Sequence, residues 1–493
     1  MIANAIAAPG LRTPRPEGPT VREDAAWRDY FDRAAHEEAR FPLGQRYLRA
    51  DVAATLGRTI PTDARVLEVG CGLGDTLASL PNPVRHGLDA CQAAVERAHV
   101  RHPELDIAHD DALRFRRDMP YDAIVCDRLV HSVPDIQRLL ENLVDHLADD
   151  GRIFLTCYNY LWEAAIRVGE TLGFKLPTPP ANWLSESDLE NLFSLVGLEV
   201  VKYEDRLLLP VPIPGVAGLL NRYVAKLPGM GRGCIYRLYV LRRRAETRHR
   251  PAAPPSVSIV VPARNEEGNV PNIIARTPKL GARTELIFVE GGSTDNTRAA
   301  IEQAIAAYSG DLELSLYPQT GKGKGDAVRV GFAKATGDIL MILDADLTVP
   351  PEELPKFYDV LVQGTTDYVH GTRLVYPMES EAMRFLNKLG NIGFSKLFTY
   401  LLNQPLKDTL CGTKVLWAHD YARLAANRHH FGDFDPFGDF DLIFGAAKLN
   451  LKILEIPIRY RDRTYGETNI SRFRHGWMLL QMSAVAARKL KFV

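Results

Sequence analysis

A proline-rich break near the middle of the sequence divides a chain of 493 residues into two halves. Residues 246–256, ETRHRPAAPPS, contain three prolines and show no hydrophobic periodicity, which indicates a linker. On either side, short apolar runs rich in β-branched residues alternate with helical patterns, as in α/β domains with mostly parallel sheets. We therefore expect a flexible N-terminus over residues 1–20, one α/β domain over 21–245, the linker over 246–256, and a second α/β domain over 257–493.

The overall composition narrows the class of protein. Apolar residues make up 46% and charged residues 25% of the chain, which excludes a collagen, a largely disordered chain and a polytopic membrane protein. The 60 Lys and Arg balance 61 Asp and Glu, so the basic excess of a dedicated nucleic-acid binder is missing. The six cysteines form no C-x-x-C pair, and the N-terminus has no basic region. We therefore expect reduced thiols and a cytoplasmic location without a signal peptide.

The strongest motif of the first half is a glycine-rich loop after a short buried strand. Residues 65–69 form the strand, and Gly70, Gly72 and Gly74 follow it before a helical pattern. Glycines let the backbone turn sharply and let a ligand approach the main chain, and the next helix offers its free N–H groups. A second strand ends in Asp89, about 20 residues after the loop, where a carboxylate can bind both hydroxyls of a ribose. This order of elements predicts a site for an adenosine-containing cofactor.

The G-x-G-x-G spacing of this loop, preceded by Glu68, resembles that of the class I S-adenosylmethionine-dependent methyltransferases, which have a Rossmann-like fold. The resemblance covers about residues 45–245 and continues in order through 88–97, 110–112, 121–127, 129–135 and 151–155. It implies S-adenosylmethionine as the cofactor, bound by Glu68, Gly70, Gly72, Gly74, Asp89 and Asp111. In that family, Gly70 and Gly72 would face the methionine part. Asp89 would face the ribose, and Asp111 the adenine amino group.

The chemistry of methyl transfer limits which residues of the first half could be catalytic. Methyl transfer from a sulfonium is an in-line displacement that depends on alignment of the reactants more than on a nucleophilic side chain. His131 is either a general base or a packing residue. The apolar stretches 176–183 and 207–220 are where elements for the methyl acceptor would lie. They indicate either a hydrophobic, lipid-linked acceptor or plain core packing.

Acidic residues follow three apolar runs of the second half. Glu266, Glu290 and the pair Asp344 and Asp346 each come after a predicted strand, and residues 321–325 (GKGKG) add a flexible basic segment. Ligands of open α/β sheets lie beyond the carboxyl ends of the strands, so we expect these side chains to converge there. Clustered carboxylates repel one another unless a cation is present, and an Asp-x-Asp pair suits Mg²⁺ or Mn²⁺ bridging to a diphosphate. Such a metal would stabilise a leaving nucleoside diphosphate as a Lewis acid.

These motifs resemble the family 2 inverting glycosyltransferases of the GT-A fold, most of all the polyprenyl (dolichyl) phosphate mannosyl- and glucosyltransferases. The resemblance covers about residues 257–475. It implies a nucleotide-sugar donor, bound by Pro262, Glu266, Glu290, Asp344 and Arg463. The metal ligands would be Asp344 and Asp346. The usual D-D-G-S motif appears here as Glu290-Gly-Gly-Ser, so the second acid is missing and recognition of the base can differ.

The same resemblance suggests residues for the acceptor and for catalysis. Arg373 and Arg384 fall where the family holds the acceptor phosphate, whose geometry a guanidinium fork fits. Asp441 and Asp439 fall where it carries the acid and the glutamine of an F-Q-x-E segment. Transfer to a hydroxyl needs a general base and transfer to an ionised phosphate does not, so these aspartates are base, metal neighbour or structural residue. Arg463 would neutralise the diphosphate; a solvated surface arginine is the alternative.

Two apolar segments with basic residues suggest contact with a membrane surface. Residues 383–402 and 477–492 carry apolar side chains at helical spacing, so each is either an interfacial helix or an ordinary packed helix. No uncharged apolar run reaches the ~18 residues of a spanning helix. We therefore expect peripheral association at most, on the inner face of the membrane. Basic residues also gather within 242–250 and 459–493, where we expect them to meet phosphates or an anionic bilayer.

Together these patterns predict a fused, bifunctional transferase. We expect methyl transfer from S-adenosylmethionine in the first half and metal-dependent, inverting sugar transfer from a nucleotide-sugar in the second. The expected sugar acceptor is a polyprenyl phosphate or a lipid-linked glycan. A first alternative is a glycosyltransferase whose first half only binds the cofactor or supports the fold. A second alternative is a non-catalytic scaffold that binds carbohydrate or lipid, and no nucleic acid is expected as a partner.

Overall fold

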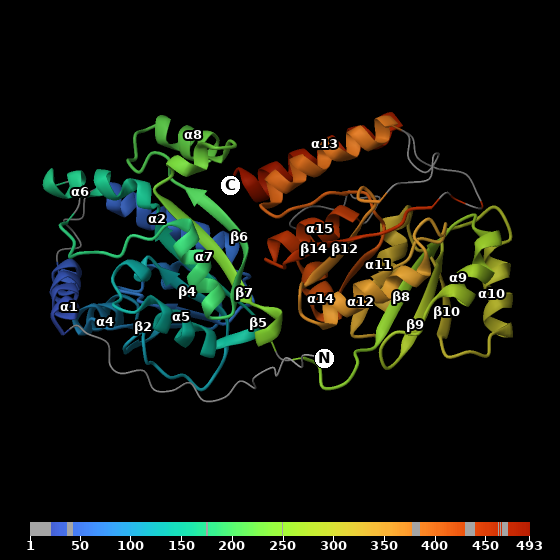
Figure 1. Cartoon of the computed structure of the whole chain (residues 1–493), viewed down its shortest axis with the longest axis horizontal. Coiled ribbons are helices and arrows are strands. Elements are labelled where there is room, and N and C mark those ends of the chain that lie inside the picture. Colours follow the sequence, from blue (N-terminus) through green and yellow to red (C-terminus); the bar gives the residue numbers. More distant parts are fainter. Residues whose placement is uncertain are drawn as a thin grey trace, which may run out of the picture.

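The computed structural model describes residues 21–36, 43–173, 176–248, 250–376, 385–428, 439–461, 463, 465 and 472–493. Two α/β lobes follow one another along the chain and lie side by side in Figure 1, the first coloured blue to green and the second yellow to red. Each lobe is built around one seven-stranded sheet. The α/β class expected for both halves is therefore confirmed.

The first sheet has the strand order β3-β2-β1-β4-β5-β7-β6. Its strands are β1 (Val66–Val69), β2 (Arg85–Asp89), β3 (Asp106–His109), β4 (Tyr121–Asp127), β5 (Leu147–Tyr158), β6 (Leu198–Arg206) and β7 (Tyr236–Arg243). Strands β3, β2, β1, β4 and β5 run parallel, whereas β7 pairs antiparallel with both β5 and β6. The carboxyl ends of β1, β2 and β4 therefore lie at one edge of the sheet, beside the glycine loop.

The helices of the first half cover both faces of this sheet. They are α1 (Val21–His36), α2 (Leu43–Thr59), α3 (Asp75–Ser79), α4 (Gln92–Arg101), α5 (Ile136–Asp145), α6 (Glu163–Thr171), α7 (Glu186–Leu195) and α8 (Val216–Arg222). Local sequence explains their starts; for example, Ser185 and Asp188 form a capping box at α7. Alternation along β1 explains the two layers, because Leu67 and Val69 pack in one core and Val66 in the other.

The second sheet has the strand order β10-β9-β8-β11-β13-β12-β14. Its strands are β8 (Val257–Ala263), β9 (Thr284–Glu290), β10 (Glu313–Pro318), β11 (Ile339–Ile342), β12 (Tyr368–Thr372), β13 (Lys414–Trp417) and β14 (Ile453–Pro457). Strands β10, β9, β8 and β11 run parallel. Strand β13 is antiparallel to β11 and β12, and β12 is parallel to β14. The carboxyl ends of β8, β9 and β11 thus meet at one edge.

The helices of the second half again form two layers. They are α9 (Val270–Arg276), α10 (Thr297–Ala307), α11 (Lys324–Lys334), α12 (Leu354–Val362), α13 (Phe385–Leu402), α14 (Ala418–Ala426), α15 (Asp439–Lys448) and α16 (Arg472–Ala486), which continues as a π-helix over Ala487–Lys491. Val260 of β8 packs in one core, and Ile259 and Val261 pack in the other. In the described part of the chain, no helix is long and apolar enough to cross a membrane.

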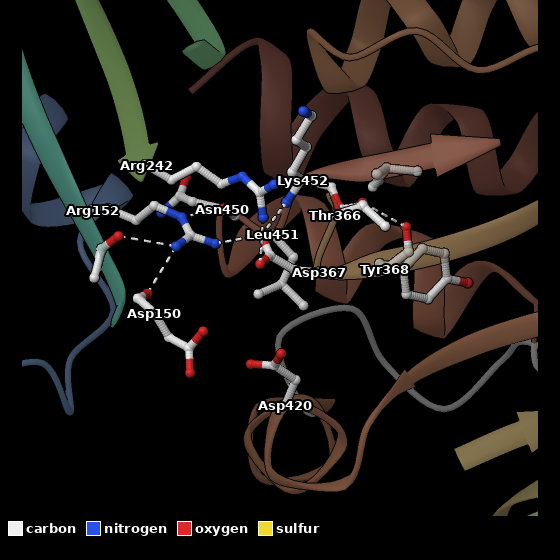
Figure 2. Close-up of polar contacts among 12 residues, drawn as sticks. Asp150, Arg152, Arg242, Thr366, Asp367, Tyr368, Asp420, Asn450, Leu451 and Lys452 are labelled. Atoms are coloured by element: carbon white, nitrogen blue, oxygen red, sulfur yellow. Dashed lines mark hydrogen bonds and ion pairs between the residues drawn. The ribbon is translucent and has the colours of Figure 1, made fainter. Parts of the chain in front are cut away.

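A buried acid joins the two halves. Asp367, immediately before β12, accepts hydrogen bonds from Arg152, Arg242 and Arg248 at 2.6, 2.7 and 2.8 Å. Figure 2 shows the first two guanidinium groups, from β5 and β7, converging on the Asp367 carboxylate. The backbone N–H of Lys452 donates to the same carboxylate at 2.8 Å. Asp367 is therefore surrounded by donors from both halves.

This contact corrects one sequence prediction. The expectation that the basic residues of 242–250 meet phosphates or a bilayer is wrong for Arg242 and Arg248. Arg242 is fully buried, and Arg248 pairs with Asp367 and Asp150. The acid that these arginines bind lies 125 and 119 residues away along the chain, so the local pattern of charges did not reveal it.

Candidate active sites

Three glycines shape the loop between β1 and α3. Gly70, Gly72 and Gly74 have φ angles of 77°, 55° and 76°, a left-handed conformation that residues with a side chain seldom adopt. A Cβ built on Gly72 would meet no atom within 4 Å, so the backbone borders open space there. The N–H groups of Gly70 and Cys71 donate to the carbonyl of Leu88 at 2.8 and 3.0 Å, which holds the loop against β2. The arrangement leaves room for a ligand to approach the main chain.

Asp89, the last residue of β2, is held against the same loop. One carboxylate oxygen accepts a hydrogen bond from the Gly72 N–H at 2.7 Å, and the other accepts from the Cys91 N–H at 2.9 Å. Burial raises the pKa of this carboxyl, and the two N–H donors act in the opposite direction. Each oxygen has a second lone pair, so the carboxylate can still accept hydrogen bonds from hydroxyl groups of a ligand.

Glu68 and Asp127 lie on the neighbouring strands β1 and β4. Glu68 is 3% exposed, and its Oε2 atom has no hydrogen-bond partner among the described residues. Burial, with Asp127 and Asp89 nearby, raises the pKa of Glu68 well above its usual range. Asp127 instead pairs with Arg128 at 2.6 Å. Sequence reasoning missed Arg128, because its positive φ of 54° at the end of β4 leaves no signature in the sequence.

Asp111 is bound within its own turn. Its carboxylate accepts hydrogen bonds from the Leu113 N–H at 2.9 Å and from Arg114 Nε at 2.8 Å. The side chain is 39% exposed, so a ligand can reach it. A contact between Asp111 and an adenine amino group stays a prediction.

His131 has both ring nitrogens engaged with the backbone. Its Nε2 accepts a hydrogen bond from the Tyr158 N–H at 2.8 Å, so Nδ1 carries the proton and donates it to the carbonyl of Asn182 at 2.6 Å. The ring is 5% exposed and lies 5.2 Å from the Tyr158 ring and 5.6 Å from the Trp183 ring. These contacts favour the packing interpretation of His131 over a role as general base.

In the second half, the carboxyl ends of the strands bring acids and cations together. Arg463 donates to Asp346 at 2.7 Å and to Glu266 at 3.3 Å. Lys324, the first residue of α11, pairs with Asp344 at 2.5 Å. The structure therefore joins three predicted residues, Glu266, Asp346 and Arg463, and it places Lys324 of the GKGKG segment against a fourth, Asp344.

The two glutamates of this edge also hold the loops that follow their strands. Glu266 accepts a hydrogen bond from Asn269 Nδ2 at 2.7 Å. Burial raises the pKa of Glu266 to about 7, against the opposing effect of Arg463. Glu290 accepts from the Ser293 N–H at 2.6 Å, which closes the turn after β9. Pro262 lies on β8 opposite β9 in the same region.

The fit of a metal ion depends on how many ligands the protein must supply. Among the described residues, no group of three or more His, Cys, Asp or Glu side chains is placed to hold a metal. Mg²⁺ sites in phosphoryl-handling enzymes, however, use one or two carboxylates together with phosphates of the substrate. Asp344 and Asp346 fit that pattern, because both carboxylates lie beside cations that a diphosphate would bind. The donor set therefore suits a metal that arrives with a nucleotide, held by these two aspartates.

Of the two arginines predicted for the acceptor, only Arg373 is described. It donates to Asp408 through Nε and a terminal nitrogen at 2.7 and 2.8 Å, and its side chain is 11% exposed. Burial alone would raise the pKa of Asp408, but Arg373 holds it well below its usual range. Arg373 is thus already bound by a carboxylate on two donors. Arg384 lies outside the described residues.

The two aspartates proposed for catalysis lie at the start of α15. Asp439 is the first residue of that helix, and Asp441 lies in its first turn. The carboxylate of Asp441 lies 3.9 Å from Arg329 and 3.5 Å from Arg428. Asp441 thus lies beside two cations, and the choice between base, metal neighbour and structural residue stays a prediction.

Comparisons with known proteins match both halves. Residues 37–203 match a methyltransferase domain family, and residues 258–418 match glycosyl transferase family 2. A SAM-dependent methyltransferase from Thermotoga maritima is similar to 44% of this chain and all of its own, at 18% identity and a TM-score of 0.36. Glucosyl-3-phosphoglycerate synthase from Mycobacterium tuberculosis, solved with Mn²⁺, uridine diphosphate and glucosyl-3-phosphoglycerate, is similar to 50% of this chain and 86% of its own. That match has 20% identity and a TM-score of 0.34.

The two family matches cover different parts of the chain and leave the proline-rich segment between them. They agree with the order of the two resemblances in the sequence. The chain is thus a two-domain transferase, with a methyltransferase domain followed by a domain of glycosyl transferase family 2.

Proposed function

We propose that both halves of the chain are active. The first half transfers a methyl group from S-adenosylmethionine. The second transfers a sugar with inversion from a nucleotide-sugar, with Mg²⁺ or Mn²⁺, to a polyprenyl phosphate or a lipid-linked glycan. The observation that carries the proposal is that Arg463 joins Glu266 to Asp346 while Lys324 lies against Asp344. A diphosphate at this edge would have cations on both sides of the Asp-x-Asp pair.

In the second half, the residues of the chain bind and orient the donor. With a pKa of about 7, Glu266 can either donate or accept a hydrogen bond toward the nucleoside at neutral pH. Arg463 exchanges one carboxylate partner for a diphosphate oxygen. A bound metal would supply Lewis-acid stabilisation of the leaving group, held by Asp344 and Asp346. Transfer to an ionised phosphate needs no general base, which agrees with the pairing of Asp441 with cations.

In the first half, the residues of the chain align the reactants. The open loop at Gly72 lets the main chain approach the cofactor, and Asp89 accepts hydrogen bonds from the ribose hydroxyls. Burial raises the pKa of Glu68 well above its usual range, and its Oε2 atom has no partner among the described residues, so it can bind a polar group of the ligand. S-adenosylmethionine would supply the electrophilic methyl group. With a lipid-linked acceptor, both reactions would take place at a membrane surface. Peripheral association with the inner face of the membrane is therefore part of the proposal.

The methyltransferase half is tested by binding of its cofactor. We expect S-adenosylmethionine to bind the wild-type chain in a calorimetric titration and to bind Asp89→Ala at least about tenfold more weakly, because a buried hydrogen-bond acceptor is lost. Asp106→Ala is the matched control, since its side chain is 65% exposed on the next strand. Absence of binding to the wild type would remove the methyl-transfer proposal.

The glycosyltransferase half is tested by hydrolysis of the donor. We expect the wild-type chain with Mn²⁺ to release nucleoside diphosphate slowly from one member of a panel of nucleotide-sugars. Asp346→Ala should abolish this release, whereas Asp311→Ala, with a side chain that is 78% exposed, should not. Addition of polyprenyl phosphate should convert hydrolysis into transfer. No metal-dependent turnover with any donor would favour the scaffold alternative, and turnover without cofactor binding would favour a glycosyltransferase with a structural first half.

A further inference from the structure

An unusual number of large apolar side chains is exposed on one short segment of the methyltransferase half. Residues 207–233 contain α8 and the two short 3-10 helices after it. Seven large apolar side chains of this segment are between 40% and 57% exposed: Val211, Ile213, Val216, Leu219, Tyr223, Leu227 and Met230. On a soluble protein, an exposed apolar surface of this kind normally marks a site of contact with another protein or a membrane.

The segment is held firmly in this position. Asn221 is buried and binds both backbone groups of Leu209, accepting from its N–H at 2.8 Å and donating to its carbonyl at 2.9 Å. Lys226 is also buried and pairs with Glu204 at 2.5 Å. These two buried polar residues therefore fix the segment from the inside, while seven of its large apolar side chains stay exposed. Because these buried polar contacts hold the segment in place, loose packing does not explain why its apolar side chains are exposed.

The charges of the segment are of one sign. Residues 207–233 contain Arg222, Lys226 and Arg232, and no Asp or Glu. Because Lys226 is used internally, the cations left at the surface are Arg222 and Arg232, which are both exposed. An exposed apolar face with arginines at its border is the pattern of a segment that lies in the interface of an anionic bilayer.

The glycosyltransferase half extends the same face. Tyr400 of α13 donates to the carbonyl of Lys226 at 2.6 Å, and Arg222 donates to the carbonyl of Phe492 at 2.9 Å. The rings of Tyr223 and Phe492 lie 5.8 Å apart. In Figure 1, α8, α13 and the C-terminus lie along one edge of the molecule, at the top of the view. The two halves therefore meet at this edge.

The segments that meet there share the same composition. Like 207–233, residues 385–402 and 472–493 contain Lys or Arg and no Asp or Glu. Trp477 and Leu480 of α16 are 63% and 51% exposed, and Arg488 and Lys489 are exposed at its end. Helix α16 packs against α13. Three segments, distant in sequence and free of acids, thus form one border of the molecule.

We propose that residues 207–233 of the methyltransferase half, together with α13 and α16, form one surface that binds a bilayer containing anionic lipids. The inference deepens the proposed function, because it names the partner surface on which a lipid-linked acceptor would be met by both halves. A second copy of the chain is a poorer occupant, since two acid-free cationic faces would repel each other. A bilayer with anionic lipids offers an apolar interior to the exposed apolar side chains and negative charge to the exposed arginines and lysines.

Vesicle co-sedimentation tests the proposal without donor, cofactor or polyprenyl phosphate, so its outcome is independent of either activity. We expect the wild-type chain to bind phosphatidylcholine vesicles that contain phosphatidylglycerol, and to bind pure phosphatidylcholine several-fold more weakly. The double variant Val216→Glu with Leu219→Glu should bind the anionic vesicles at least about tenfold more weakly, because two apolar side chains would no longer enter the interface. The matched control is Val100→Glu with Leu195→Glu, which changes exposed apolar residues of α4 and α7.

A charge variant keeps the test valid if the apolar variant folds poorly. Arg232→Glu with Arg488→Glu should weaken binding to anionic vesicles several-fold and make it less sensitive to salt. Arg138→Glu, an exposed position on α5, is the control. Equal binding to neutral and anionic vesicles, or no binding by the wild type, would overturn the proposal. So would a dimer in light scattering that Val216→Glu with Leu219→Glu dissociates, and donor hydrolysis would remain a separate measure of the proposed function.

Discussion

The guanidinium of Arg242 and the carboxylate of Asp367 form an ion pair of 2.7 Å across the boundary between the two halves, with side chains that are 1% and 3% exposed. Arg152 and Arg248 bind the same carboxylate. Burial alone would raise the pKa of Asp367, but the three arginines together hold it well below its usual range. The acid comes from the second half, and Arg152 and Arg242 come from the first. Neither half alone would neutralise the charges that it buries at the boundary, so the two depend on each other.

We predict that Asp367→Asn destabilises the whole chain. The buried Arg152 and Arg242 and the partly buried Arg248 would lose their common acid, and removal of one partner from such a site costs about 3–5 kcal/mol. Chemical denaturation followed by circular dichroism should show this loss, whereas Asp359→Asn, on the exposed face of α12, should leave the free energy of unfolding nearly unchanged. A variant as stable as the wild type would show that the arginines find other partners.

We predict that Asp420 makes the chain less stable as the pH rises. Asp420 lines a cavity of about 230 Å³ between the halves, beside Asp367 and Arg423. Burial, opposed by His419 and reinforced by Asp367 and Asp150, raises its pKa to about 6. A raised carboxyl pKa contributes stability below the unfolded value near 4, and that stability is lost as the pH rises through about 6. The loss amounts to at most about 3 kcal/mol.

The matching measurement is unfolding of Asp420→Asn between pH 4 and pH 8. The variant should gain stability relative to the wild type as the pH rises, because an amide cannot ionise in the cavity. The difference between the two proteins is the quantity to compare, since Glu266 and Glu455 also have a pKa raised to about 7 and act in the same range. A constant difference across this range would mean that Asp420 does not titrate there.

We predict that Gly72→Ala weakens binding of S-adenosylmethionine more than it weakens the fold. The new Cβ would point into the open space at the loop, and its left-handed backbone would cost about 1–2 kcal/mol. Gly173→Ala is a matched control, because Gly173 has a φ of 77° and equally open surroundings but lies after α6. Both variants should lower the melting temperature similarly, and only Gly72→Ala should lose at least about tenfold in affinity. Equal affinities would place the cofactor elsewhere.

We predict that Gly412→Ala inactivates the second half. A Cβ at this position would collide with the carboxylate of Asp344 and the ammonium of Lys324. Displacement of a positioning group by about 1 Å can cost roughly 100-fold in rate, so Mn²⁺-dependent hydrolysis of the donor should fall by that order. Gly393→Ala on α13, where a Cβ meets nothing within 4 Å, should retain full turnover. Normal activity of Gly412→Ala would mean that Asp344 can move without loss.

Much of both sites could be read from local sequence. The glycines after β1 and the acids at or after the ends of β2, β8, β9 and β11 follow short apolar runs bounded by turn residues, which is the local pattern of a strand and the loop after it. The partners of these residues could not be read in the same way. Lys324 beside Asp344 and Arg463 between Glu266 and Asp346 depend on how loops from separate strands meet.

Two residues show what tertiary contacts add to the interpretation of the sequence. His131 follows a strand in a position suited to catalysis, but its ring nitrogens bind the backbone of Tyr158 and Asn182, which lie 27 and 51 residues further along. Arg373 carries a guanidinium suited to phosphate, but Asp408 already binds it on two donors. Neither partner is a sequence neighbour, so no spacing rule predicts the pair.

The sequence by itself determined the two α/β halves, the order of their motifs and the residues at the strand ends, because these follow from hydrophobic period and backbone preference within a few residues. The tertiary structure alone decided which charges are buried and what they bind. Arg242 looks like a surface residue of a basic run, yet it lies in the domain boundary with Asp367, 125 residues away. The physical reason is that a buried charge is stable only beside its partner, and the fold, not the chain, sets that distance.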